Sequence, residues 1–175
     1  MSLDFIVVGT GRDGTVTMTK LIEEIFQLNN LQGTVCHEYA AGDFYNEFCA
    51  YQLSGDSVHQ DSIRKLIVEC PYRAIVGNGY ATVLPIFKEI YPNIKLIHLI
   101  RADKDAFVRS MVKNAKLFPE SHKNYVDSEG LISRTAAFHV GEMTETEWND
   151  LSIDARFRWY YDYTHKEIEK YKPIW

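Results

Sequence analysis

The stretch that decides the fold is residues 5–15, which read FIVVGTGRDGT. It begins with four apolar residues typical of a β-strand and becomes polar and glycine-rich from Gly9. Apolar residues then recur at helical spacing through residues 18–28. In a strand, glycine loop and helix of this order, exposed amides at the helix N-terminus can face an anion. The sequence therefore predicts a phosphate-binding loop, and an ordinary glycine turn is the alternative.

Outward from this unit, short apolar runs alternate with helical periodicity along most of the chain. Further strands are expected at residues 34–36, 74–76 and 94–100. Apolar spacing indicates helices over residues 44–51, 63–70, 84–91 and 157–171. Alternating strands and helices joined by short loops imply right-handed crossovers and a mainly parallel sheet. We therefore expect one three-layer α/β domain over residues 1–175, with helices on both faces of the sheet.

Composition narrows the function classes. The chain has 175 residues, of which 46% are apolar, and a net charge of −5. That charge argues against broad binding of nucleic acid or of an anionic membrane surface. No apolar run approaches the roughly 20 residues that span a bilayer. Without a basic, apolar leader at the N-terminus, the chain is expected to be cytoplasmic. Three cysteines without CxxC spacing predict packing residues rather than a disulfide or zinc site: Cys36, Cys49 and Cys70.

The glycine loop satisfies parts of two known phosphate-binding patterns. Gly9 and Gly14 match the Walker A spacing, but Thr15 and Val16 stand where that motif has Lys and Ser or Thr. ATP or GTP hydrolysis is therefore not expected. The dinucleotide fingerprint GxGxxG is met literally within residues 9–14, and Glu38 follows at about the distance of the acidic residue that holds the ribose. An NAD(P)-binding domain is therefore one alternative.

A third pattern comes from a family resemblance. Residues 11–15, GRDGT, resemble the 5′-phosphosulfate loop of sulfotransferases that use 3′-phosphoadenosine 5′-phosphosulfate (PAPS). The stretch YPNIKLIHLIR at residues 91–101 resembles the family's strand that ends in arginine, and Ser110 follows at nearly the usual distance. Residues 36–38 resemble the family's segment after its second strand. Residues 148–160 are similar to its late helix.

The resemblance implies a P-loop NTPase-like sulfotransferase fold and a metal-free transfer from PAPS that leaves 3′,5′-adenosine bisphosphate. It implies that the 5′-phosphosulfate is held by the loop residues Gly11, Arg12, Asp13, Gly14, Thr15 and Val16. Arg101 and Ser110 would bind the 3′-phosphate. Arg12 would also be catalytic, because its guanidinium can stabilise charge on the leaving phosphate.

An acceptor hydroxyl or amine also needs a general base. His37 and Glu38 both follow the second expected strand, on the same sheet edge as the glycine loop. The resemblance favours Glu38, whereas an imidazole has the more suitable ordinary pKa, near 6.5. Either residue could instead be a surface or helix-capping residue. Asn78, after the third strand, is expected in a turn, and His98 inside the fourth strand is expected in the core.

Two departures from the family pattern support a further alternative, a nucleotide-binding relative without turnover. Asp13 stands where the family usually has Ser or Gly, and would bring a carboxylate beside an anionic ligand. The sequence ends at Trp175, before the family's usual final strand, so a short or truncated member is expected. The acceptor would be a small molecule or glycan. Residues 119–146 are polar and weakly patterned, which fits either a substrate-covering loop or a surface excursion.

Overall fold

The computed structural model of the chain describes residues 3–117 and 135–174. These residues form a four-stranded parallel sheet in the order β2-β3-β1-β4. The strands are β1 (Phe5–Val8), β2 (Val35–His37), β3 (Ala74–Gly77) and β4 (Lys95–His98). Phe5 of β1 is in register with Ala74 on one side and Lys95 on the other, so the carboxyl ends of these strands lie at one edge. The expected parallel α/β sheet is confirmed.

Among the described residues, helices fill the connections between the strands and follow β4. The α-helices are α1 (Thr15–Leu28), α2 (Ala41–Ser54), α3 (Ser57–Val68), α4 (Leu84–Ile90), α5 (Lys104–Leu117), α6 (Glu145–Asp150) and α7 (Ile153–Glu169). Short 3₁₀ turns cover η1 (Ala81–Val83) and η3 (Ala137–Val140).

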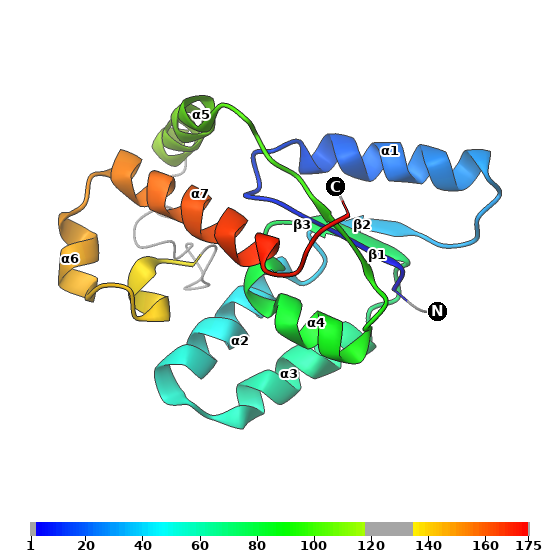
Figure 1. Ribbon diagram of the computed structural model, residues 1–175, viewed down its shortest axis with the longest axis horizontal. Coiled ribbons are helices and arrows are strands. Elements are labelled where there is room, and N and C mark those ends of the chain that lie inside the picture. The colour runs from blue at the N-terminus through cyan, green and yellow to red at the C-terminus, as the bar shows by residue number, and fades with distance from the viewer. Residues whose placement is uncertain (1–2, 118–134, 175) are drawn as a thin grey trace.

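Helices cover both faces of the sheet, as the alternation of side chains along the strands requires. Ile6 and Ile75 belong to a buried cluster with residues of α2, α3 and α4. Val7 and Val76 point to the other face, where they pack against Ile22 and other residues of α1. Figure 1 shows α1 on one side of the sheet and α3 and α4 on the other. The expected layers are therefore confirmed.

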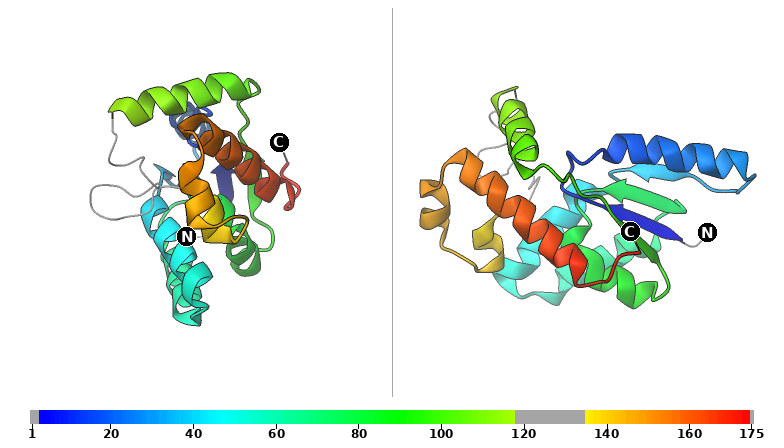
Figure 2. Two further views of the ribbon diagram at one scale, coloured as in Figure 1. Left: turned by 90° about the vertical axis from the view of Figure 1, so that its left-hand side faces the viewer. Right: turned by 45° about the horizontal axis from the view of Figure 1, so that its top comes forward.

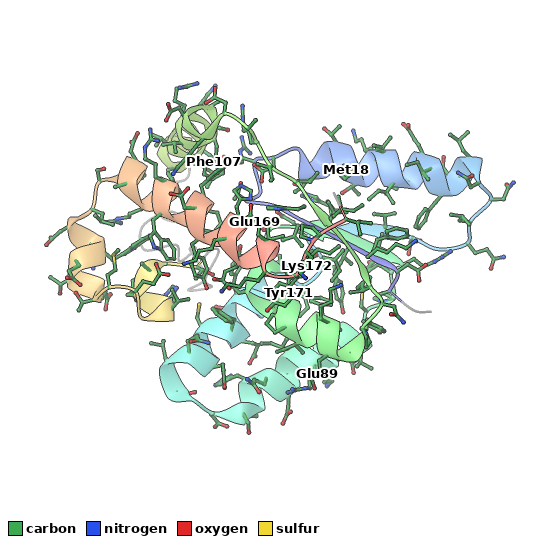
Figure 3. The ribbon with its side chains drawn as sticks, in the orientation of Figure 1. Met18, Glu89, Phe107, Glu169, Tyr171 and Lys172 are labelled. Atoms are coloured by element: carbon green, nitrogen blue, oxygen red, sulfur yellow. The ribbon has the colours of Figure 1, made fainter. Side chains whose placement is uncertain are left out.

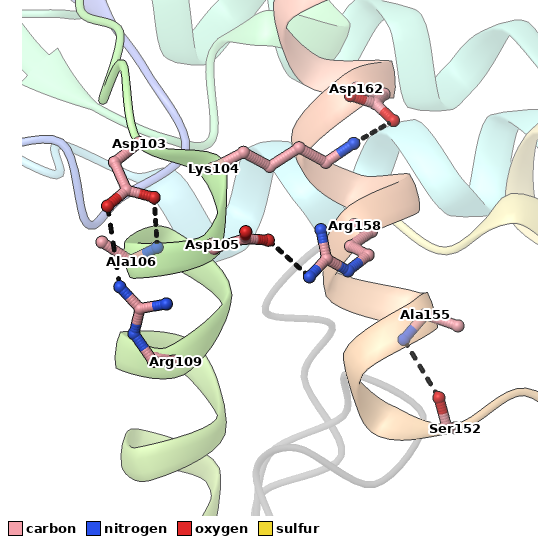
Figure 4. Close-up of polar contacts among 9 residues, drawn as sticks. All are labelled: Asp103, Lys104, Asp105, Ala106, Arg109, Ser152, Ala155, Arg158 and Asp162. Carbon is pink, nitrogen blue, oxygen red and sulfur yellow. Dashed lines mark hydrogen bonds and ion pairs between the residues drawn. The ribbon is translucent and has the colours of Figure 1, made fainter.

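The helices α5, α6 and α7 lie beside the sheet (Figure 2), and a third apolar cluster joins them. Phe107 of α5, fully buried and labelled in Figure 3, packs with Trp148 and Phe157. Two ion pairs also join α5 to α7 (Figure 4): Lys104 to Asp162 and Arg158 to Asp105, each at 2.5 Å. This packing fixes the direction in which α5 leaves β4.

Several expected boundaries were wrong. The second strand lies one residue later than residues 34–36, and β4 is shorter than residues 94–100. Ile94 is not in the strand because its N–H donates to the Tyr91 carbonyl, in the turn that contains Pro92. The stretch 148–160 is not one helix, because the Ser152 hydroxyl caps a new helix by accepting from the Ala155 N–H.

Three other expectations have mixed outcomes. Cys49 and Cys70 are buried, as expected of packing residues, and Cys36 is partly buried against the same core. Of the weakly patterned residues 119–146, those before 135 lie outside the described residues, and those from 135 on include η3 and the first residues of α6. Across the described ranges, no helix has both the length and the apolar character that crossing a membrane requires.

Candidate functional site

The loop between β1 and α1 requires glycine at positions where side chains would not fit. Gly11 has a φ of 88°, and a Cβ there would lie 2.7 Å from Nδ2 of Asn78. A Cβ at Gly9 would lie 2.6 Å from Oδ2 of Asp13 and 2.9 Å from the Leu99 carbonyl. The loop is therefore packed closely against the ends of β3 and β4, and α1 begins directly after it.

A pocket of about 210 Å³ opens between this loop and the segment that runs from Arg101 into α5. Its walls are formed by Gly11, Arg12, Gly14, Thr15, Val16, Arg101 and Ser110. These are the residues expected to bind the two phosphates, apart from Asp13, although two of them are about 90 positions from the rest. The pocket is smaller than the roughly 300 to 1,000 Å³ of typical sites for whole small-molecule ligands. Its size suits phosphate groups rather than an entire nucleotide.

Two guanidinium groups give this pocket its positive charge. Arg12 donates from Nε to Ser110 Oγ at 3.2 Å, and Arg101 donates from Nη1 to the Arg12 carbonyl at 3.4 Å. Among the described residues, neither guanidinium forms an ion pair with a carboxylate. Tyr161 of α7 donates from its hydroxyl to the Arg101 carbonyl at 2.7 Å. The pocket therefore offers unpaired cationic donors to an anion.

The Asp13 carboxylate forms hydrogen bonds within the loop and does not line this pocket. Its Oδ2 accepts hydrogen bonds from the Thr10 N–H and, at 2.7 Å, from the Thr10 hydroxyl, and lies against Gly9. Burial raises the pKa of the Asp13 carboxyl, although the bonds from Thr10 oppose the shift. The carboxylate therefore lies inside the loop and not on the pocket wall, where we had expected it beside the ligand.

The two candidate bases differ in their surroundings. His37, the last residue of β2, is partly buried, and its Nε2 lies 3.0 Å from Thr15 Oγ1 on the pocket wall. Glu38 has an exposed side chain and a left-handed backbone with a φ of 56°. Its side-chain stem lies beside Gly77 at the end of β3. Of the two residues, His37 is the one that a hydrogen bond among the described residues connects to the pocket.

Other buried polar residues lie at the ends of β3 and β4, next to the loop. Asn78 is 7% exposed, and the Tyr45 hydroxyl donates to its carbonyl at 3.0 Å. His98 is 7% exposed, in agreement with a core position, and its Nε2 lies 2.7 Å from Nδ1 of His165. The pairing of His98 with His165 and the placing of Asn78 against Gly11 had no local sequence signal, since the partners lie far apart in the chain. The described residues contain no group of three or more His, Cys, Asp or Glu that could hold a metal ion.

The strand order bears on the dinucleotide alternative. In dinucleotide-binding domains the order is 3-2-1-4, so the strand that precedes the ribose-binding acid lies next to the first strand. Here β3 lies between β1 and β2, and β2 pairs with β3. Glu38 therefore follows a strand one place farther from the glycine loop than that alternative requires.

Comparison of the sequence with protein families found a match. A family model described as a sulfotransferase domain matches residues 4–173, nearly the whole chain. No curated protein matches the sequence.

Proposed function

Because this chain belongs to the sulfotransferase domain family, we propose that it transfers a sulfuryl group from PAPS to a hydroxyl or amine of a small-molecule or glycan acceptor. The observation that carries the proposal is the convergence of Arg12, Arg101 and Ser110 on one pocket at the glycine loop. Its two guanidiniums lack carboxylate partners among the described residues, which suits a ligand with several phosphate charges.

In the proposed complex, Arg12 and the amides at the start of α1 hold the 5′-phosphosulfate, and the Thr15 hydroxyl donates to it. Arg101 and Ser110 hold the 3′-phosphate. The present contacts among Arg12, Arg101 and Ser110 are 3.2 and 3.4 Å long and exposed. A phosphate oxygen that replaces such long contacts gains charge-assisted bonds at little cost to the fold.

The proposed transfer is an in-line displacement at sulfur. The bond from sulfur to the acceptor oxygen or nitrogen forms as the bond from sulfur to the 5′-phosphate oxygen breaks. Negative charge grows on that phosphate, where Arg12 stabilises it. The acceptor proton goes to a base, for which we propose His37 rather than Glu38. The contact between His37 and Thr15 supports this choice, because it holds the imidazole at the wall of the donor pocket.

Thermal denaturation with added ligands tests the proposal, because a ligand that binds the native state raises stability. The ligands are 3′,5′-adenosine bisphosphate, ATP and NAD at equal concentrations. The proposal predicts the largest shift with the bisphosphate. A larger shift with NAD would favour the dinucleotide alternative. Binding of the bisphosphate without turnover of PAPS on any hydroxyl or amine acceptor would favour a non-catalytic relative.

A further inference from the structure

Asp13 is a charged residue of the glycine loop that has no part in the proposed transfer. Its Oδ2 accepts from both the N–H and the hydroxyl of Thr10 and so closes the loop across three positions. The absence of a side chain at Gly9 leaves room for this carboxylate. The other oxygen, Oδ1, is buried and has no hydrogen-bond partner among the described residues.

The groups that face Asp13 come from four parts of the fold. Thr10 belongs to the loop, His98 to β4, Arg101 to the segment after β4, and Tyr161 to α7. Arg101 interacts favourably with the ionised carboxylate, and so does His98 when it is protonated, which burial makes harder by lowering its pKa. Arg101 is also on the wall of the anion pocket. An ionised Asp13 therefore places a negative charge next to the pocket. This charge interacts with Arg101, one of the two cations that line the pocket.

We propose that Asp13 is a positioning residue that regulates the donor site: it shapes the loop through Thr10, and its negative charge weakens the binding of phosphate groups in the pocket. This inference rests on the proposed function, since it concerns the affinity of the same site for a nucleotide that carries two phosphates. The hydrogen bonds from Thr10 to Asp13 should raise the affinity for the nucleotide, whereas the negative charge of Asp13 should lower it. Variants that remove the charge but keep a hydrogen-bond acceptor distinguish the two effects.

The charge effect has a defined pH dependence. The pKa of Asp13 is raised above its ordinary value of 3.8 by burial, so the carboxyl becomes neutral on acidification earlier than an exposed aspartate. Above this pKa the negative charge opposes anion binding, and below it the opposition is lost. Asp13→Asn is neutral at every pH and keeps an oxygen that accepts from Thr10. Its affinity advantage over the wild type should therefore be largest at pH 8 and should disappear as the pH falls.

The experiment measures the affinity for 3′,5′-adenosine bisphosphate by calorimetry from pH 8 to pH 4. At each pH the affinity of Asp13→Asn is divided by that of the wild type. Both proteins then meet the free ligand in the same ionisation state. We expect Asp13→Asn to bind about threefold to tenfold more tightly at pH 8, the size of a partly screened charge effect near a surface. Asp13→Ser, a second neutral variant, should also gain affinity, whereas Asp13→Ala should bind less tightly than either because no side-chain atom accepts from Thr10.

The proposal would be overturned if Asp13→Asn and Asp13→Ser both bound the bisphosphate with the wild-type affinity at every pH. Tighter binding by the wild type than by these variants at pH 8 would also overturn it. If the wild type binds no bisphosphate at any pH, the proposed function fails, and unfolding then tests Asp13 separately. Because the raised pKa means that the folded protein favours the neutral carboxyl, Asp13→Asn should be more stable than the wild type at pH 8, with a smaller difference at pH 4. Equal stability differences at both pH values would overturn the charge effect.

Discussion

Arg12 donates a hydrogen bond from Nε to Ser110 Oγ at 3.2 Å, across a separation of 98 positions in the sequence. The contact joins the glycine loop after β1 to α5, which follows β4. Because β1 and β4 are neighbours in register, the segments that follow them meet at one edge of the sheet. Two separate sequence motifs therefore contribute to one pocket.

Replacing Arg12 tests whether this pocket binds the nucleotide. Arg12→Ala should weaken the binding of 3′,5′-adenosine bisphosphate by roughly 10-fold to 150-fold, the value of a charge-assisted hydrogen bond of about 1.5 to 3 kcal/mol. Any sulfuryl transfer should fall by about 100-fold to 1,000-fold. The matched control is Arg109→Ala, since Arg109 lies on α5, is largely exposed and pairs with Asp103. Calorimetry that gives equal affinities for the two variants would contradict the assignment of Arg12.

The identity of the base is tested by a pair of neighbouring substitutions. His37→Ala should lower turnover by about 100-fold to 10,000-fold, as the loss of a general base does, while the bisphosphate affinity changes little. Glu38→Ala should keep most of the turnover, because its side chain is exposed and lies beside Gly77. The reverse result in steady-state kinetics would assign the base to Glu38. Full turnover in both variants would exclude both residues.

Because Gly11 lies close to Asn78, alanine at Gly11 should destabilise the protein more than alanine at Gly141. Gly11 and Gly141 both have positive φ, 88° and 74°, but only a Cβ at Gly11 would meet other atoms. Gly141→Ala should therefore cost only the backbone strain, about 1 to 2 kcal/mol. Gly11→Ala should destabilise the protein more in urea unfolding and should weaken nucleotide binding. Adding Asn78→Ala should recover part of the loss, and equal losses at both glycines would contradict the packing described.

The buried histidine pair predicts a loss of stability in acid. Burial lowers the pKa of His165 to about 4 and also lowers the pKa of His98, whereas an unfolded histidine titrates near 6.5. The unfolded chain therefore binds more protons, and stability should fall as the pH falls from 6.5 towards 4. His165 alone accounts for a loss on the order of 3 kcal/mol over that range. His165→Phe should reduce the slope of unfolding free energy against pH, and an unchanged slope would contradict this account.

Much of the fold could be predicted because its signals are local. The run from Phe5 to Val8, the glycines after it and the apolar spacing of α1 lie within one short stretch, and β1 and α1 have the expected order. The helix expected over residues 84–91 is also present as α4, which ends at Ile90, two residues before Pro92. The order of the strands had no such signal, because placing β3 between β1 and β2 depends on how the crossovers pack. The break at Ser152 was missed because apolar residues continue on both sides of it.

The candidate site shows the same limit. Types of residue that bind phosphate could be identified in the loop and after β4, but the direction of a side chain could not. Asp13 was expected beside the ligand; in the folded chain its carboxylate accepts hydrogen bonds from Thr10 and does not line the pocket. The choice of His37 over Glu38 as the candidate base depends on a contact between His37 and Thr15. These residues are 22 positions apart, and the contact exists only in the folded chain.

The most direct test of the central claim uses the group that distinguishes PAPS from ATP and NAD, the 3′-phosphate. Calorimetry compares 3′,5′-adenosine bisphosphate with 5′-AMP on the wild type and on Arg101→Ala. The account predicts that the wild type prefers the bisphosphate by roughly 10-fold to 150-fold. Arg101→Ala should lose most of that preference and keep its affinity for 5′-AMP. Equal affinities of the wild type for the two nucleotides would contradict the account.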